Sequence, residues 1–375
     1  MLYLEMSEIM KKKVLIGVII IGLGILIGFD YGIFIIPRLV NYPLMHDIAS
    51  DYVGARALIN HNKELYPVLK DAFQEIGINW NADHRSTHPP TAYLLVVPLT
   101  FLNYPTAQFV WMAAMFVCIV LTYRVLSLNW GMALLAGLLS LAWPPGIWSL
   151  GQLTPIWLLG LALAYRYRGQ PLISGVSIAI ASLPKLLPAP SLLYHLWRKK
   201  WSVLIGFVTV WVVALAAVLF LRPDAISAFF NSNSTNSLEQ ILRTDNSALV
   251  VAAWRVGGWF GIVLVAAFVL YVLWKGLGTN GPYGWACLVW ISIALLPIAW
   301  IYSLFPLLPW LGITIRTSTP VPRLLAIVSF LLPFFAPIPT IMPWAVSLSV
   351  VLSGLSFALA AVDQKYKDNR SHVIS

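Results

Sequence analysis

The chain has 375 residues, of which 59% are hydrophobic and only 10% are charged, whereas a soluble domain carries about 25% charged residues. This composition excludes an ordinary soluble protein. The apolar residues come in runs of roughly 20, the length that crosses a hydrocarbon core about 30 Å thick, so the sequence predicts an all-α, polytopic transmembrane helical bundle.

The net charge is +10, and the basic residues are distributed according to the predicted path of the chain through the membrane. Basic clusters flank the apolar runs, at Lys11 to Lys13, at Arg166 and Arg168, and at Arg198 to Lys200. The positive-inside rule assigns these clusters to the cytoplasm. Since the basic residues mark the ends of apolar runs, no nucleic-acid partner is expected.

The first apolar run covers residues 14–36. It is too long for a signal peptide and lacks a small-residue cleavage pattern, so it predicts an uncleaved helix with a cytoplasmic N-terminus. Asp30 lies near the outer end of this run. An intramembrane acid of this kind either binds substrate or pairs with a basic neighbour.

A polar window follows, and it holds six of the 14 acidic residues and four of the six histidines. One crossing from a cytoplasmic N-terminus makes residues 37–90 a large first extracytoplasmic loop. Apolar side chains at helical spacing predict short interfacial helices within it.

Further apolar segments bring the total to about 10–13 helices, some of them too short for a full crossing or re-entrant. They cover residues 90–103, 105–126, 131–145, 148–165, 171–197, 201–221, 248–274, 283–301, 303–315, 324–338 and 341–362. The bundle is predicted to be a single domain over residues 1–362.

Residues 171–197 predict a hairpin, because cytoplasmic basic clusters bound the segment on both sides. Pro184, Pro188 and Pro190 break it near its midpoint, since proline removes a backbone donor. Lys185 then lies at the apex, toward the outer leaflet.

The count of crossings assigns a second polar window, residues 222–247, to the outer side, where it could fold over the first window. Residues 363–375 form a polar tail whose basic side chains predict a cytoplasmic C-terminus. The expected location is therefore a multi-pass position in the cell membrane, with both termini in the cytoplasm and the polar windows outside.

Asp47 is the first candidate for chemistry, because a carboxylate just past the outer end of a helix can take a proton from a sugar or lipid hydroxyl as general base. Asp51 lies four residues on, so a helix would put both carboxylates on one face. A solvated loop acid or a helix N-cap is the alternative interpretation of Asp47.

Lys185 and Arg255 are candidates for binding phosphate, because a cation at membrane depth is costly and usually has a partner. The alternative is snorkelling, in which the stem lies in lipid and the charged group reaches water. The proline-broken apex favours phosphate binding for Lys185, whereas snorkelling is favoured for Arg255.

His84 and His88 have an i, i+4 spacing that can hold a metal ion, but the Glu of the HExxH pattern is missing, so neither a metal nor a cofactor is predicted. The chain also has no Walker loop, no run of gating arginines and no TVGYG filter. The acids cluster in an outer loop, which favours chemistry at the membrane surface over ion relay.

Short motifs in a fixed order resemble those of glycosyltransferase family 87. From residue 40 to about residue 260 they are Asp47 with Tyr52, Ala57-Leu58, Leu65-Tyr66-Pro67, His88-Pro89-Pro90 with Pro98, Gly151-Gln152, Gly169 with Gly175, Lys185 with Pro188, and Asn246-Ser247. His88 stands where the family pattern has tyrosine.

The resemblance implies a polytopic GT-C enzyme that transfers a sugar, mannose or a related one, from a polyprenyl-phosphate donor to a lipid or glycan acceptor. It implies inversion, no nucleotide sugar, and a first-loop aspartate as base, which falls on Asp47. Lys185 falls on the lysine of the Lys/Pro motif, and Asp51 falls where the family often has tyrosine or another residue. The expected substrate-binding residues are Asp51, Tyr52, His88, Gln152, Lys185, Asn246 and Arg255.

Two other functions stay open at this point. A transporter or lipid flippase would use the outer loop as a lid and would line its translocation path with Asp30 and Lys185. A hydrolase of surface lipid-glycans would require Asp47 and Asp51 as a working pair.

Overall fold

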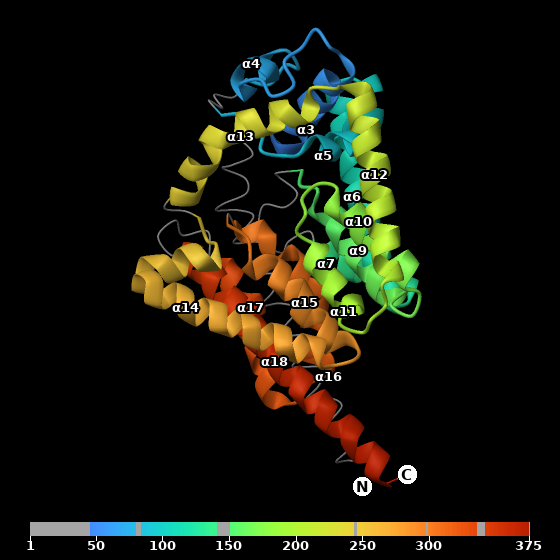
Figure 1. The fold of residues 1–375 in the computed structure, drawn as a ribbon, viewed down its shortest axis with the longest axis vertical. Coiled ribbons are helices and arrows are strands. Elements are labelled where there is room, and N and C mark those ends of the chain that lie inside the picture. The colour runs from blue at the N-terminus through green and yellow to red at the C-terminus, as the bar shows by residue number, and fades with distance from the viewer. Residues whose placement is uncertain are drawn as a thin grey trace, which may run out of the picture. The chain divides into compact units, whose positions relative to one another are not determined.

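The computed structural model describes residues 46–79, 84–140, 151–243, 246–297, 299–335 and 342–374. Of two compact units, Met1–Tyr42 and Pro43–Ser375, the second contains all of them. The predicted first helix and Asp30 lie outside the described residues. Within the described ranges the chain forms helices and contains no strand (Figure 1), which confirms the all-α prediction.

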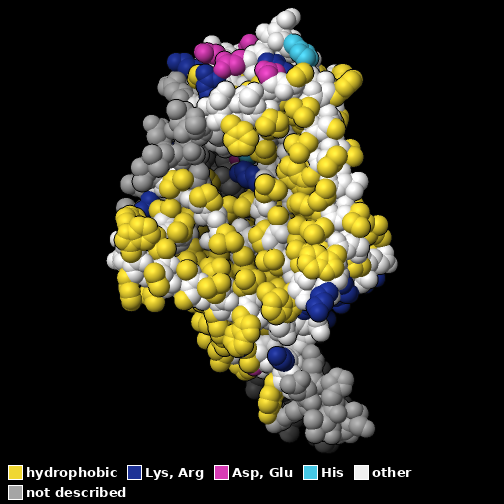
Figure 2. Space-filling model, viewed as in Figure 1, with side chains coloured by type: hydrophobic (Ala, Val, Ile, Leu, Met, Phe, Trp, Pro, Cys, Tyr) yellow, Lys and Arg dark blue, Asp and Glu magenta, His cyan; other side chains and the backbone are white. Residues whose placement is uncertain are grey.

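Four of the described helices are long and apolar enough to cross a membrane. They are α6 (Tyr104–Val125), α12 (Ser202–Leu221), α14 (Leu249–Leu277) and α18 (Met342–Ile374). Hydrophobic side chains form a broad band over the visible face of the molecule (Figure 2). This is the surface expected of a polytopic bundle in contact with lipid tails.

Shorter helices complete the bundle, as their lengths in the sequence predict. They are α5 (Pro90–Val96) with the 3₁₀ helix η2 (Val97–Phe101), α7 (Trp130–Ser140), α9 (Thr154–Arg166), α10 (Pro171–Ser182), η3 (Ala189–Leu192), α11 (Leu193–Leu196), α15 (Pro282–Ala294), η4 (Ile301–Leu307), α16 (Leu308–Thr317), α17 (Pro320–Leu331) and η5 (Leu332–Phe335). α15 is buried along its whole length, so the larger hydrophobic core is built around it.

The first polar window contains two helices, α3 (His46–Ile59) and α4 (Leu69–Gln74), as predicted. They share a second core with α5 and α6. Aromatic side chains fill this core, among them the fully buried rings of Tyr66, Phe73 and Tyr93. The window is therefore a packed structure at one end of the bundle.

The segment 171–197 breaks where the prolines predict. α10 ends at Ser182, and after the turn the chain continues as η3 and α11, so the second arm is much less regular than the first. α10 packs tightly against α12: a Cβ atom on Gly175 would lie 2.0 Å from the carbonyl oxygen of Val203. Glycine at this point lets the two backbones touch.

Two segments differ from the sequence-based expectation. The second polar window, to which no helix was assigned, contains α13 (Ala225–Leu242), and α18 continues to Ile374, through most of the predicted polar tail. Asn and Ser favour turns over helices, but packing overrides that preference. In α13 the ring of Phe229 packs against Tyr66, with 5.9 Å between the ring centroids.

Candidate functional site

The site is built on α3, whose helical spacing puts Asp47 and Asp51 one turn apart on one face, as predicted. α3 lies close to α5, since a Cβ atom on Gly54 would lie 2.4 Å from the ring of Tyr93. Asp47 is partly exposed, whereas Asp51 is fully buried. The two carboxylates therefore have different surroundings and different access to a ligand.

Asp51 forms a close pair with His88. The Nδ1 atom of His88 lies 2.6 Å from Oδ1 of Asp51, and both side chains are buried. The Oδ2 atom of Asp51 has no hydrogen-bond partner among the residues that the structure describes. Burial raises the pKa of Asp51, and the contact with His88 opposes this shift.

His88 is held from its backbone as well as from its ring. The hydroxyl of Tyr66 donates to the carbonyl oxygen of His88 over 3.0 Å. Pro89 and Pro90 follow directly, and Pro90 is the first residue of α5. Proline fixes the backbone φ angle at the start of the helix. The position of His88 is thus set by α5, by Tyr66 and by Asp51.

Lys185 joins this group from the turn after α10. Its charge interacts with Asp47 and with Asp51. The turn is anchored to α5, because the hydroxyl of Thr91 donates to the carbonyl oxygen of Leu183 over 2.7 Å. Within the described parts of the chain the Lys185 ammonium makes neither a hydrogen bond nor an ion pair within 4.0 Å. Burial lowers the pKa of Lys185, and the two carboxylates oppose this shift.

Tyr52 and Gln152 were also predicted to bind substrate. The hydroxyl of Tyr52 donates to the carbonyl oxygen of Leu102 over 2.6 Å, and its ring packs edge-on against Tyr104. Gln152 is buried beside Gly151, whose carbonyl oxygen accepts from Nε1 of Trp111 over 3.0 Å. Tyr52 thus ties α3 to the end of η2, and binding by either residue stays a prediction.

Asn246 and Arg255 lie together at the start of α14. The amide of Asn246 donates to the carbonyl oxygens of Ile241 and Pro297, and its oxygen accepts from the backbone NH groups of Ala248 and Ala299. Arg255 donates to the carbonyl oxygen of Asn246 over 3.0 Å. The side chain of Asn246 therefore holds the backbone in place, and substrate binding by these two residues stays a prediction.

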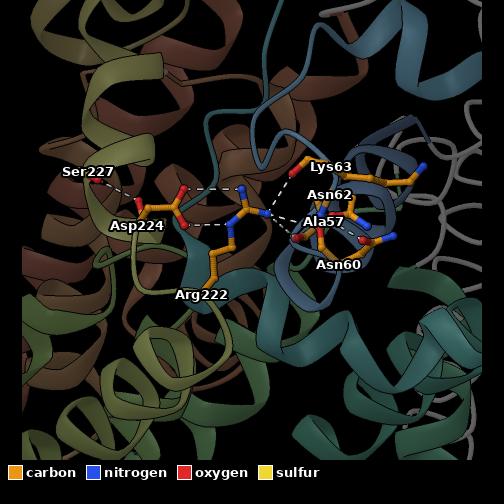
Figure 3. A network of polar contacts seen from close by, with 7 residues as sticks. All are labelled: Ala57, Asn60, Asn62, Lys63, Arg222, Asp224 and Ser227. Atoms are coloured by element: carbon orange, nitrogen blue, oxygen red, sulfur yellow. Dashed lines mark hydrogen bonds and ion pairs between the residues drawn. The ribbon is translucent and has the colours of Figure 1, made fainter.

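Arg222 is a structural anchor of the site that sequence reasoning did not identify. It follows α12, and its guanidinium donates to the carbonyl oxygens of Ala57 and Lys63, each over 2.9 Å (Figure 3). Asp224 binds the same guanidinium over 2.8 Å. Arg222 thus joins the second polar window to the end of α3. An Arg after an apolar run was visible in the sequence, but its partners were not.

Among the described residues no group of three His, Cys, Asp or Glu side chains is arranged to hold a metal ion. His88 instead pairs with Asp51. Asp47, Asp51, His88 and Lys185 form the group that the structure brings together, referred to below as the α3 site.

Comparison with known protein families identifies a match. The sequence model of glycosyltransferase family 87 matches residues 87–302, which is more than half of the chain. The match includes His88 and Lys185 and begins after Asp47 and Asp51, and it extends past residue 260, where the motif resemblance ended. No curated protein and no solved structure matches the chain.

Proposed function

The chain belongs to glycosyltransferase family 87, and on this basis we propose that it transfers a hexosyl residue, mannose or a related sugar, from a polyprenyl-phosphate donor to a lipid or glycan acceptor. The coarser part of this statement, a membrane glycosyltransferase, follows from the family and from the four spanning helices. The donor, the sugar and the acceptor are proposals.

The ammonium of Lys185 is the observation that supports a phosphate-linked donor best. A cation half-buried beside two carboxylates, without a hydrogen-bonding partner in the described parts of the chain, is open to an anion. The phosphate of a polyprenyl-phosphate sugar is such an anion, and its lipid tail would run along the hydrophobic band. Lys185 would then stabilise the charge that collects on the phosphate as it leaves.

Asp47 is the better base of the two carboxylates, because it is partly exposed whereas Asp51 is fully buried. Asp47 takes the proton of the acceptor hydroxyl, whose oxygen attacks the anomeric carbon of the donor. The bond between that carbon and the phosphate oxygen breaks, and the polyprenyl phosphate leaves with its electron pair. Attack from the side opposite the leaving group inverts the anomeric configuration.

The charge distribution supports an outer active site with cytoplasmic termini. Acidic and histidine side chains gather, together with several basic ones, at the end of the molecule that carries α3 and α4, whereas the charged side chains in view at the other end of the hydrophobic band are mostly Lys and Arg (Figure 2). The positive-inside rule puts that basic end in the cytoplasm. An active site on the outer side has no access to cytosolic nucleotide sugars, so its sugar donor is embedded in the membrane.

A comparison of binding with turnover tests this proposal against the transporter alternative. In lipid nanodiscs, Asp47→Asn should still bind the polyprenyl-phosphate sugar but lose about 10²-fold or more of its turnover, the usual contribution of a general base. A transporter predicts the reverse: Asp47→Asn keeps turnover, while substitution of Asp30 or Lys185 abolishes it. Lys199→Gln, in the basic cluster after α11, is the control for loss of a cation outside the α3 site.

A further inference from the structure

The ring of His88 presents two nitrogen atoms in different situations. Nδ1 lies 2.6 Å from Oδ1 of Asp51. Nε2 makes no hydrogen bond with any residue in the described ranges, and the side chain keeps 10% of its surface exposed. An almost buried ring with one satisfied nitrogen and one accessible nitrogen is suited to receive a ligand group.

Asp51 determines which nitrogen carries the proton. A carboxylate accepts a hydrogen bond, so it favours the tautomer of His88 that donates from Nδ1 and keeps its lone pair on Nε2. Asp51 itself has no exposed surface and therefore cannot meet a substrate directly. Its hydrogen-bonded contact with the site passes through His88.

We infer that His88 accepts a hydrogen bond at Nε2 from a hydroxyl group of the donor sugar or of the acceptor, and that Asp51 is the residue that positions the ring. This inference rests on the proposed function and adds a hydroxyl contact to the α3 site beside Lys185. Asp51 is then a positioning residue, in place of the substrate-binding role predicted from the sequence.

A purely structural role is the competing explanation. In that case the bond between Nδ1 and Asp51 fastens α5 to α3 and neutralises a buried carboxylate, and Nε2 has no role. The two explanations differ in the nitrogen atom that matters. Asn and Gln substitutions separate them, because an Asn amide reaches about as far as Nδ1 and a Gln amide reaches about as far as Nε2.

The experiment compares His88→Asn and His88→Gln with wild type in a sugar-transfer assay, with donor and acceptor concentrations varied separately. We expect Gln to keep kcat/KM within about threefold and Asn to lose roughly tenfold or more, the value of one hydrogen bond to substrate. The KM that rises in His88→Asn, for donor or for acceptor, identifies the molecule that carries the hydroxyl. The control is His61→Asn, an exposed histidine after α3.

Asp51→Asn adds a second readout. If Asp51 acts through His88, the substitution Asp51→Asn lowers kcat/KM in the wild-type background. Added to His88→Asn, it lowers kcat/KM no further. Thermal unfolding of each variant shows that the loss is not a loss of folding.

The inference is overturned if His88→Asn keeps wild-type kcat/KM while His88→Gln loses it, or if both folded variants lose it equally. A wild-type protein that forms no product with any donor overturns the proposed function, and this inference with it. That result is distinct, because every variant is then equally inactive.

Discussion

A buried carboxylate is costly unless its charge is neutralised, and Asp51 meets this requirement with one oxygen atom only. Oδ1 lies against His88, whereas Oδ2 has no hydrogen-bond partner within the described part of the chain. An unsatisfied buried polar atom costs about 1–3 kcal/mol. A cost of this size is expected if Asp51 is kept for activity at the expense of stability.

Asp51→Asn should therefore stabilise the protein at neutral pH. Burial raises the pKa of Asp51 above 3.8, its ordinary value, so Asp51 stabilises the fold at low pH and loses this contribution as the pH rises through its raised pKa. Asn removes the loss, because its amide carries no charge. We expect a higher unfolding midpoint than wild type at pH 7, and a smaller difference near pH 4. A lower midpoint at pH 7 would contradict this account of Asp51.

Lys185→Gln should weaken donor binding about tenfold or more while the fold stays intact, because Gln keeps the length of the side chain but not the charge. Binding of the polyprenyl-phosphate sugar, measured at several pH values, is the readout. Burial lowers the pKa of Lys185. The affinity of the wild-type protein for the donor should therefore fall at a lower alkaline pH than it would if an exposed lysine bound the phosphate. Unchanged affinity in Lys185→Gln would exclude Lys185 as the phosphate ligand.

Some of the α3 site was predictable from the sequence and some was not. The spacing of Asp47 and Asp51 predicts a shared helix face, and the prolines around Lys185 predict its place at a turn. The pairing of Asp51 with His88 joins residues 37 positions apart through tertiary packing. Local spacing carries no information about such a contact.

At the scale of helices, the site depends on how α12 and α13 meet α3. Arg222 donates to carbonyl oxygens at the end of α3, where the helix leaves acceptors without an internal partner. A cation at this end also interacts favourably with the helix dipole. The polar sequence of α13 gave no sign of a helix, because the packing of Phe229 on Tyr66 is tertiary.

Arg222→Ala should destabilise the protein by roughly 3 kcal/mol, because it leaves the buried carbonyl oxygen of Ala57 and the partly buried one of Lys63 without this donor. Asp224→Ala is the matched variant, since it removes the other partner of the same guanidinium. The side chain of Asp224 is 58% exposed, so we expect a loss under about 1 kcal/mol. Chemical unfolding in mild detergent measures the loss of stability in both variants. Equal losses would show that the contacts to the carbonyl oxygens do not contribute to stability.

Gly175→Ala should disrupt the contact between α10 and α12. The added Cβ atom would lie 2.0 Å from the carbonyl oxygen of Val203, so the helices must separate, at a cost of about 1–3 kcal/mol. Gly169 is the control, because a Cβ atom there meets nothing within 4 Å. We expect Gly169→Ala to leave the unfolding midpoint within error. If Gly175→Ala also left it unchanged, the close packing of these helices would be refuted.

At the scale of the molecule, the scarcity of charge makes the α3 site stand out. The apolar runs predict the membrane helices well, since hydrophobic length is a property of the local sequence. Helix ends are less predictable: the segment expected over 283–301 ends as α15 at Ala294. The family match covers the bundle from residue 87 to residue 302, while the proposed base lies ahead of it on α3.

Transfer of a radiolabelled sugar by the purified protein tests the proposed reaction as a whole. Polyprenyl-phosphate sugars and nucleotide sugars are supplied separately, together with membrane lipids as acceptors. We predict a labelled lipid or glycan from at least one polyprenyl-phosphate sugar, none from the nucleotide sugars, and none with Asp47→Asn. Product from a nucleotide sugar alone, or equal product with Asp47→Asn, would contradict the proposal.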